Sequence, residues 1–358
     1  MGEISSYEQT LLGLSLPAPD QAAAEAARTR WNAVAKPIGS LGLLEDAVVQ
    51  MAALTGTADV DISRRCVAVL CADNGVVSEG VSQSSQDVTT LVASSIARGT
   101  SSVCRMCAPA GIDCLAVDMG MARDPHVEGV VNRRIAAGTA NIAVGPAMTR
   151  EQAARAVMVG VDLVGELRSQ GYGLVATGEM GIGNTTTATA MACAFLGLPP
   201  AQLVGRGAGL SNEGLQRKRA VVERALAIHE PQADDPLDVL SKLGGFDIAG
   251  MCGLFLGGAV HRVPIVADGL ISLVAAHCAW RMRPECLQAI LASHVSAEPA
   301  ASLLLEGMGL RAPIHAGLRL GEGTGAVCLV PLLDMALSLY RDGTTFGGLG
   351  IAPYEVMR

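Results

Sequence analysis

The feature that most constrains this chain is the alternation of short apolar runs with longer segments of helical periodicity. Five runs are rich in β-branched or other apolar residues and are predicted to be strands: residues 66–72, 113–118, 173–177, 263–267 and 288–293. Helical patterns lie between them, for example at residues 88–106 and 150–167. Nearly continuous apolar strands that alternate with helices are typical of a mostly parallel sheet covered on both faces.

The two ends of the chain have helical patterns and no convincing strand. They comprise residues 1–60 and most of residues 324–340. We predict a large α/β domain of residues 60–323 and a small helical domain made of residues 1–59 together with residues 324–358. The alternative is that both helical ends cover the sheet itself.

Composition favours a protein that acts on small molecules inside the cell. The formal net charge of the 358 residues is −8 and no long run of Lys or Arg occurs, whereas nucleic-acid binders have basic surfaces. The N-terminus has no secretory pattern, and the longest uncharged apolar stretch, residues 248–260, is shorter than the roughly 20 residues that cross a bilayer. We expect a soluble, cytoplasmic protein with no nucleic-acid or membrane partner.

The ten cysteines lie mostly in apolar runs, which is typical of buried free thiols. Cys104 and Cys107 form a C-x-x-C pattern within a helical segment, but no second Cys or His pair lies at zinc-ligand spacing. We therefore expect no disulfide framework and no metal site.

Polar residues and glycines gather directly after the predicted strands. In chain order they are Asp73 and Asn74, Asp118, Gly178 and Glu179, Asp268 and Gly269, and finally His294 and Ser296. In an open parallel sheet, ligands bind beyond the carboxyl ends of the strands. Turn residues occur at every strand end, but this number of Asp, Glu, Ser and His side chains favours one shared binding crevice.

The segment TGEMGIGNTTTATA, residues 177–190, follows a predicted strand and opens a helix. Its glycines, Gly178, Gly181 and Gly183, allow backbone N–H groups to face an anion, and the helix N-terminus favours phosphate. Asn184 and Thr185 follow, where a triphosphate-binding P-loop would have a lysine after the last glycine. The segment therefore predicts a site for one phosphate or for a phosphorylated ribose. An ordinary helix-entry loop is the alternative.

A second glycine-rich loop, with Gly205, Gly207 and Gly209, precedes a helical pattern that contains Lys218. On a helical wheel, Lys218 falls near the middle of the apolar face, opposite Arg217 and Arg224. An unpaired cation on a buried face is costly, so Lys218 is predicted to bind the phosphate. The alternative is that its ammonium reaches solvent along the helix surface.

Glu322 lies between two glycines, just before a strongly apolar helical pattern. A carboxylate in a loop of this kind is suited to act as a general base. An acidic residue that merely favours the helix N-terminus is at least as well supported by spacing alone.

Taken together, the motifs resemble the nicotinate-nucleotide:dimethylbenzimidazole phosphoribosyltransferase family along most of the chain. In the family's order, the matching segments are KPIGSLGLLE (36–45), ADNGVVSEGVS (72–82), QDVT (86–89), RIAAGTANIAVGPAMT (134–149), GEMGIGNTTTA (178–188), VGRGAG (204–209), GGFDIAGM (244–251), ADGLIS (267–272), SHVSAEPA (293–300) and GEGTGA (321–326). About ten segments in order and at similar spacing are highly specific.

The resemblance implies a Rossmann-like parallel sheet, a small helical domain built from both chain ends, a homodimer, and no metal or other cofactor. It implies that Glu322 is the general base and that Gln86 contacts the incoming base, beside Ser84 and Ser85. The residues expected around the nucleotide and its phosphate are Glu179, Gly181, Gly183, Asn184, Thr185, Gly207, Lys218 and Ser296.

The implied reaction transfers the phosphoribosyl group of nicotinate mononucleotide to 5,6-dimethylbenzimidazole, giving α-ribazole 5′-phosphate and nicotinate for the lower ligand of a cobamide. One departure concerns the base. Many family members have an aromatic residue shortly before the position of Gln86, where this chain has Ser-Gln-Ser-Ser at 82–85. Less stacking area widens the candidate bases to adenine, benzimidazole and other azoles.

Three other functions are weighed against transfer. A nicotinamide-dependent dehydrogenase would need G-x-G-x-x-G after its first strand and an acidic residue about 20 positions later, and this arrangement is absent. A nucleotide hydrolase would use Glu322 to activate water. A catalytically silent nucleotide-binding subunit would not depend on Glu322 for its function.

Overall fold

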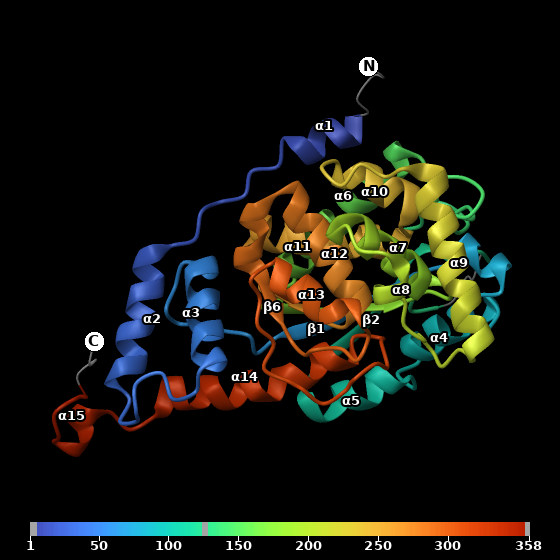
Figure 1. The fold of residues 1–358 in the computed structure, drawn as a ribbon. Coiled ribbons are helices and arrows are strands. Elements are labelled where there is room, and N and C mark those ends of the chain that lie inside the picture. Colours follow the sequence, from blue (N-terminus) through green and yellow to red (C-terminus); the bar gives the residue numbers. More distant parts are fainter. Residues whose placement is uncertain (1–5, 124–127, 355–358) are drawn as a thin grey trace.

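The computed structural model describes residues 6–123 and 128–354 (Figure 1). Six parallel strands form one sheet in the order β3-β2-β1-β4-β5-β6, so the chain starts near the middle and then builds each side, as in Rossmann-type folds. The strands are β1 Arg65–Ala72, β2 Asp113–Gly120, β3 Val131–Asn132, β4 Leu174–Met180, β5 Ile265–Ala267 and β6 Ile290–Ala292.

The predicted parallel sheet is confirmed, and each predicted strand overlaps an observed one. The prediction lacks β3, because two residues at a sheet edge leave no periodic pattern. It also ends the third predicted strand too early. That strand, β4, continues to Met180, so Gly178 and Glu179 lie inside it and pair with Val69 and Leu70 of β1.

Helices cover both faces of this sheet (Figure 1). Those before the glycine-rich loops are α1 Ser6–Leu12, α2 Gln21–Ala33, α3 Leu43–Thr55, α4 Asp87–Ala97, α5 Ser102–Ala110 and α6 Arg150–Ser169. Those after β4 are α7 Asn184–Leu196, α8 Pro200–Leu203, α9 Asn212–His229, α10 Pro236–Leu243, α11 Phe246–His261, α12 Leu270–Met282, α13 Ala300–Gly307, α14 Thr324–Asp342 and α15 Phe346–Leu349. Two 3-10 helices, Gly75–Glu79 and Pro284–Ala289, complete the set.

The two helical patterns predicted in the first half differ in outcome. Residues 150–167 fall within the single helix α6, which Thr149 begins with a reciprocal capping box. Residues 88–106 do not form one helix. Gly99, at a φ of +70°, breaks the pattern into α4 and α5, and the Ser101 hydroxyl starts α5 by accepting a hydrogen bond from the N–H of Cys104.

β1 shows why the strands appear in the sequence as continuous apolar runs. Alternate side chains of a strand point to opposite faces. Ala68 and Leu70 pack in the core beneath α6 and α11, whereas Val67 and Val69 pack in the core shared with α5 and α14. All four side chains are fully buried, so neither face of β1 can carry a polar residue without cost.

The two chain ends meet beside the sheet. The rings of Trp31 in α2 and Tyr340 in α14 lie 5.0 Å apart, and the N–H of Ala35 bonds to the carbonyl of Thr344 at 2.8 Å. α3 packs on both α2 and α14, but α14 also contacts β4 and α5, and α1 packs on α6. The division into a domain of residues 60–323 and a domain of residues 1–59 plus 324–358 stays a prediction. Residues 1–5 and 355–358 of the second domain lie outside the residues that the structure describes.

One helix within the described residues, α14, is long and apolar enough by length and composition to cross a membrane. Of its apolar stretch, 56% is buried inside the molecule, where it covers one face of the sheet. A core helix passes the same test, and the burial of α14 is consistent with a core helix.

Candidate active site

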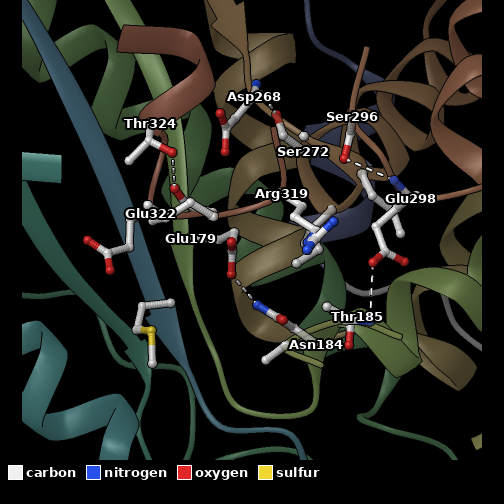
Figure 2. Close-up of a pocket in the computed structure, with 18 of the residues that line it drawn as sticks. Glu179, Asn184, Thr185, Asp268, Ser272, Ser296, Glu298, Arg319, Glu322 and Thr324 are labelled. Atoms are coloured by element: carbon white, nitrogen blue, oxygen red, sulfur yellow. Dashed lines mark hydrogen bonds between the residues drawn. The ribbon is translucent and has the colours of Figure 1, made fainter. Parts of the chain in front are cut away.

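A cavity of about 310 Å³ opens at the carboxyl ends of β4, β5 and β6 (Figure 2). It is lined by parts of the segments 179–185, 207–208, 268–272, 294–298 and 318–325, together with Ser84 and Val88. The predicted crevice therefore exists, but three strand ends form it rather than five. Asp73 shows why the β1 end differs, since its buried carboxylate accepts hydrogen bonds from Thr89 Oγ1 and the N–H of Ala122, both at 2.7 Å.

Glu322 projects from a strained loop at one end of this cavity. Its φ is +59°, and the adjacent Gly321 and Gly323 have φ values of +87° and +90°. A left-handed backbone is rare in residues other than glycine. Close packing holds it here: the Glu322 carbonyl lies so near Gly178 that a Cβ on Gly178 would be 2.6 Å from the carbonyl oxygen. The Glu322 carboxylate points away from Thr324, the first residue of α14 (Figure 2). It accepts a hydrogen bond from the N–H of Val103, in the first turn of α5, at 3.1 Å.

Asp268, at the end of β5, anchors the same loop. Its buried carboxylate accepts hydrogen bonds from the N–H groups of Gly323 at 3.3 Å and Ala326 at 3.0 Å. These are among the N–H groups that a helix start leaves without partners. Asp268 thus connects the strand that ends at the cavity to the residue directly after Glu322.

Glu179 faces the middle of the cavity, between Glu322 and Asn184 in the view of Figure 2. Burial raises the pKa of Glu179 to about 8, and the neighbouring carboxylates of Asp247 and Asp268 act in the same direction. At neutral pH the side chain is then largely a carboxylic acid, able to donate as well as accept a hydrogen bond.

The Asn184 amide joins Glu179 to a second acid behind the cavity wall. Its Nδ2 donates to Glu179 Oε2 and, at 2.9 Å, to Asp247 Oδ2. Asp247 is fully buried, and burial raises its pKa to about 6. Because both N–H bonds of the amide go to carboxyl groups, the Asn184 side chain has no further donor for a phosphate. Any phosphate contact at this position must use the backbone.

Lys218 lies in the wall next to Thr185. The residue has no exposed surface, and its Nζ donates to Thr185 Oγ1 at 3.0 Å. Burial lowers the pKa of Lys218 to about 8, against the opposing effect of the Glu298 carboxylate. A buried ammonium has three N–H donors, and in the described part of the chain only Thr185 accepts a hydrogen bond from Lys218. This favours an anionic ligand nearby.

Glu298 was not among the predicted site residues, and it occupies a central place. Its Oε1 accepts a hydrogen bond from the N–H of Gly207 at 3.1 Å, and its buried Oε2 has no hydrogen-bond partner among the described residues. A Cβ on Gly205 would lie 1.8 Å from Oε2, so only glycine leaves room for the carboxylate. No local motif predicts this, because residues 205–207 and 298 meet only in the folded chain. The exposed cation Arg319, also absent from the prediction, lines the same end of the cavity.

The structure brings most of the predicted residues together. Those that line the cavity are Ser84, Glu179, Gly181, Asn184, Thr185, Gly207, Ser296 and Glu322. Lys218 and Gly183 lie behind this lining. Ser85 is exposed, and the Gln86 amide donates to the Asn74 carbonyl at 3.3 Å, so neither contributes to the cavity wall in this chain taken alone.

All ten cysteines are free, and eight are buried, which confirms the prediction of buried thiols for those eight. Cys104 and Cys107 are both buried in α5. Within residues 6–123 and 128–354, no group of three or more His, Cys, Asp or Glu side chains is arranged to hold a metal ion.

Comparison with known proteins gives concordant results. A family model described as "Phosphoribosyltransferase" matches residues 16–351. A protein of Acetivibrio thermocellus named nicotinate-nucleotide–dimethylbenzimidazole phosphoribosyltransferase is 44% identical over 326 residues, which cover 91% of this chain and 93% of the relative. A protein of the same name from Ruminiclostridium cellulolyticum is 42% identical over 329 residues, 92% of this chain and 94% of the relative.

Solved structures agree with these matches. The crystal structure of CobT from Thermus thermophilus superposes with a TM-score of 0.87 at 39% identity, covering 92% of this chain and 99% of that one. A structure from the same organism under the full enzyme name, nicotinate-nucleotide–dimethylbenzimidazole phosphoribosyltransferase, superposes with a TM-score of 0.86 at 38% identity, covering 94% and 100%.

Proposed function

This chain belongs to the nicotinate-nucleotide–dimethylbenzimidazole phosphoribosyltransferase family, and on that premise we propose that it transfers the phosphoribosyl group of nicotinate mononucleotide to 5,6-dimethylbenzimidazole or a related azole. The products are nicotinate and α-ribazole 5′-phosphate, which serves the activation of a cobamide lower ligand. One observation carries the proposal: a carboxylate, Glu322, lines the same cavity as Gly207 and Thr185, whose hydroxyl accepts a hydrogen bond from the Lys218 ammonium.

The phosphate is assigned to the end formed by Thr185, Gly207 and Lys218, with Ser296 beside it. Thr185 and Gly207 line the cavity, and the Lys218 ammonium lies directly behind the Thr185 hydroxyl. The N-terminus of α7, which has no side-chain cap, adds the positive end of a helix dipole. The Glu298 carboxylate already lies at this end, so the phosphate must displace it or share the cations with it.

The chemistry requires little from the protein beyond position and one base. An unprotonated ring nitrogen of the azole attacks C1′ of the ribose from the face opposite nicotinate. The C1′–N bond to nicotinate breaks, and its electron pair neutralises the pyridinium nitrogen. The other ring N–H of the azole becomes acidic as the new bond forms, and the Glu322 carboxylate takes this proton. Alignment of the two substrates contributes several kcal/mol more, on the order of the effect seen in intramolecular reactions.

The azole is assigned to the part of the cavity lined by Val88, Met180 and Ile182, next to Glu322. Ser84 lines the same cavity with a hydroxyl, from the segment in which many family members have an aromatic ring. Smaller stacking area and a polar hydroxyl favour adenine or benzimidazole as alternative bases. We propose Gln86 and Ser85 as further base contacts in the assembled homodimer, because neither lines the cavity in the single chain.

The test combines purified enzyme, nicotinate mononucleotide and one azole at a time, with products identified by mass. Release of nicotinate that depends on the azole, together with an α-linked nucleotide, supports transfer. Release at the same rate without any azole would instead support a hydrolase. Competition among dimethylbenzimidazole, benzimidazole and adenine then ranks the bases.

A further inference from the structure

The imidazole of His294 is a polar group on the cavity wall that the proposed mechanism does not use. His294 lies two residues beyond β6, is only 3% exposed and lines the cavity together with Ser296. Its ring is held against the start of α14, since a Cβ on Gly325 would lie 2.1 Å from both Nδ1 and Cε1. The ring position is therefore determined by the loop that also carries Glu322.

The hydrogen bonds around Ser293 determine which ring nitrogen of His294 carries the proton. The Ser293 hydroxyl donates to the carbonyl of Ala267 at 2.6 Å, and a carbonyl can only accept. A hydroxyl has one proton, so Ser293 Oγ must accept in its second contact, which is with His294 Nδ1 at 2.9 Å. His294 therefore has its proton on Nδ1, and Nε2 has a lone pair.

Nε2 is open to the cavity. It has no hydrogen-bond partner in the part of the chain that the structure describes. The absence of a side chain at Gly269 leaves space in front of it, because a Cβ there would lie 3.6 Å from Nε2 and 3.6 Å from Ser296 Oγ. Burial lowers the pKa of His294, although the Asp268 carboxylate opposes this, so the ring is neutral near pH 7 and Nε2 is an acceptor.

An acceptor in this place needs a ligand that donates a hydrogen bond. In nicotinate mononucleotide the carboxylate is an acceptor, and the phosphate carries about −1.5 to −2 charges at pH 7. The two ribose hydroxyls are the donors that stay protonated throughout this pH range. His294 also lies between the two ends of the site, with Ser296 on the phosphate side and the Gly325 backbone on the side of Glu322. The ribose joins those ends in the nucleotide.

We propose that Nε2 of His294 accepts a hydrogen bond from one ribose hydroxyl, so that the enzyme distinguishes ribonucleotides from deoxyribonucleotides. The proposal rests on the proposed function for the identity of the nucleotide. Ser293 is then a positioning residue, which acts through the tautomer of His294.

Two substitutions separate this contact from a general effect on folding. In His294→Gln the side-chain amide reaches the place of Nε2 and can present its oxygen there. In His294→Asn the shorter amide reaches only the place of Nδ1, so the cavity loses its acceptor while a polar group still faces Ser293. Both variants introduce an amide, and thermal unfolding of each tests whether the protein is folded.

The measurement is calorimetric binding of nicotinate mononucleotide and its 2′-deoxy and 3′-deoxy analogues. We expect wild-type protein to bind one deoxy analogue about 10-fold more weakly, as for loss of one hydrogen bond that leaves a buried acceptor unpaired. His294→Gln should retain most of this preference, and His294→Asn should lose it. Equal affinity of wild type for all three nucleotides, or an unchanged preference in folded His294→Asn, overturns the proposal.

Azole-dependent release of nicotinate, measured on the same samples, keeps the two proposals apart. If the enzyme catalyses transfer but His294→Asn leaves the ribose preference unchanged, the role of His294 is refuted and the proposed function stands. A ribose preference that depends on His294, without azole-dependent release, supports the contact and refutes transfer.

Discussion

The Glu322 carboxylate accepts a hydrogen bond from the backbone N–H of Val103 at 3.1 Å, across 219 residues of sequence. Val103 lies in the first turn of α5, whose positive end favours a negatively charged partner. The proposed base is thus held by a helix on one side and by the Asp268-anchored loop on the other. Both restraints limit the positions that the carboxylate can take when it meets an incoming N–H group.

Replacing Glu322 by Gln should abolish most of the transfer without loss of nucleotide binding. The Gln side chain retains an oxygen for the Val103 N–H but cannot take a proton. We expect kcat to fall about 100-fold or more, the usual range for a lost general base, with nearly unchanged affinity for nicotinate mononucleotide. Steady-state kinetics and calorimetry measure both, and the exposed Glu306→Gln on α13 is the matched control. Full turnover in Glu322→Gln would exclude the proposed mechanism.

Replacing Lys218 by Met should weaken nucleotide binding while leaving the empty protein at least as stable. The variant removes a buried ammonium that donates a hydrogen bond to Thr185, and an apolar side chain of similar length avoids the cost of burying the charge. Loss of a charge-assisted contact corresponds to a rise in Kd of roughly 10- to 100-fold. Calorimetry with inorganic phosphate tests this, with Lys242→Met on α10 as control. Unaltered phosphate binding would remove Lys218 from the site.

The pKa of Lys218 predicts opposite pH trends for stability and for phosphate binding. Its folded value of about 8 lies below the ordinary 10.5, so the unfolded chain binds the proton more strongly between these values. The ligand-free protein should gain stability as pH rises from about 8 to 10.5, because the unfolded chain then loses the extra bound proton that stabilises it. Phosphate affinity should fall over the same range as the ammonium is lost. Urea unfolding and phosphate titration at pH 7 and pH 9 measure the two effects, and Lys218→Met should show neither.

Replacing Glu298 by Gln should strengthen binding of inorganic phosphate. The carboxylate now holds the N–H of Gly207 and contributes negative charge next to Lys218, so it competes with an incoming anion. Gln retains an acceptor for Gly207 without the charge, and we expect affinity to improve roughly 3- to 10-fold, as for removal of one partly buried repulsion. A decrease in affinity would instead mean that Glu298 organises the phosphate site rather than occupying it.

His277 should make the fold sensitive to acid at a position far from the reaction. Its ring packs between Phe195 and Trp280, and its buried Nδ1 has no partner within residues 6–123 and 128–354. Burial lowers the pKa of His277 from 6.5 to about 4. Below pH 6.5, His277 takes up a proton in the unfolded chain but stays neutral in the folded protein. The free energy of unfolding therefore falls as the pH drops towards 4. The loss between pH 7.5 and pH 5 is on the order of 2 kcal/mol. Urea unfolding of wild type and His277→Phe at both values measures it, and equal pH dependence in the two proteins would contradict the assignment.

Much of the fold was predictable because its determinants are local. The strands around residues 66–72 and 173–177 are apolar on both faces, and such runs have few stable environments other than the centre of a covered parallel sheet. Lys218 was placed on the buried face of its helix by spacing alone, and the structure confirms that burial. The short strand β3 and the break between α4 and α5 were missed, because edge pairing and one left-handed glycine leave little periodic signal.

The sequence by itself determined the sheet, the glycine loops, the buried lysine and the family. Only the tertiary structure decided how the site is connected: the Val103 contact of Glu322, the carboxylate of Glu298 between Gly205 and Gly207, the two acids that share the Asn184 amide, and the proton on Nδ1 of His294. Periodicity reports which face of an element is buried, since that depends on neighbours three or four residues away. Most of these hydrogen bonds join segments tens to hundreds of residues apart, so they depend on how loops at the sheet edge meet, and no local pattern encodes that meeting.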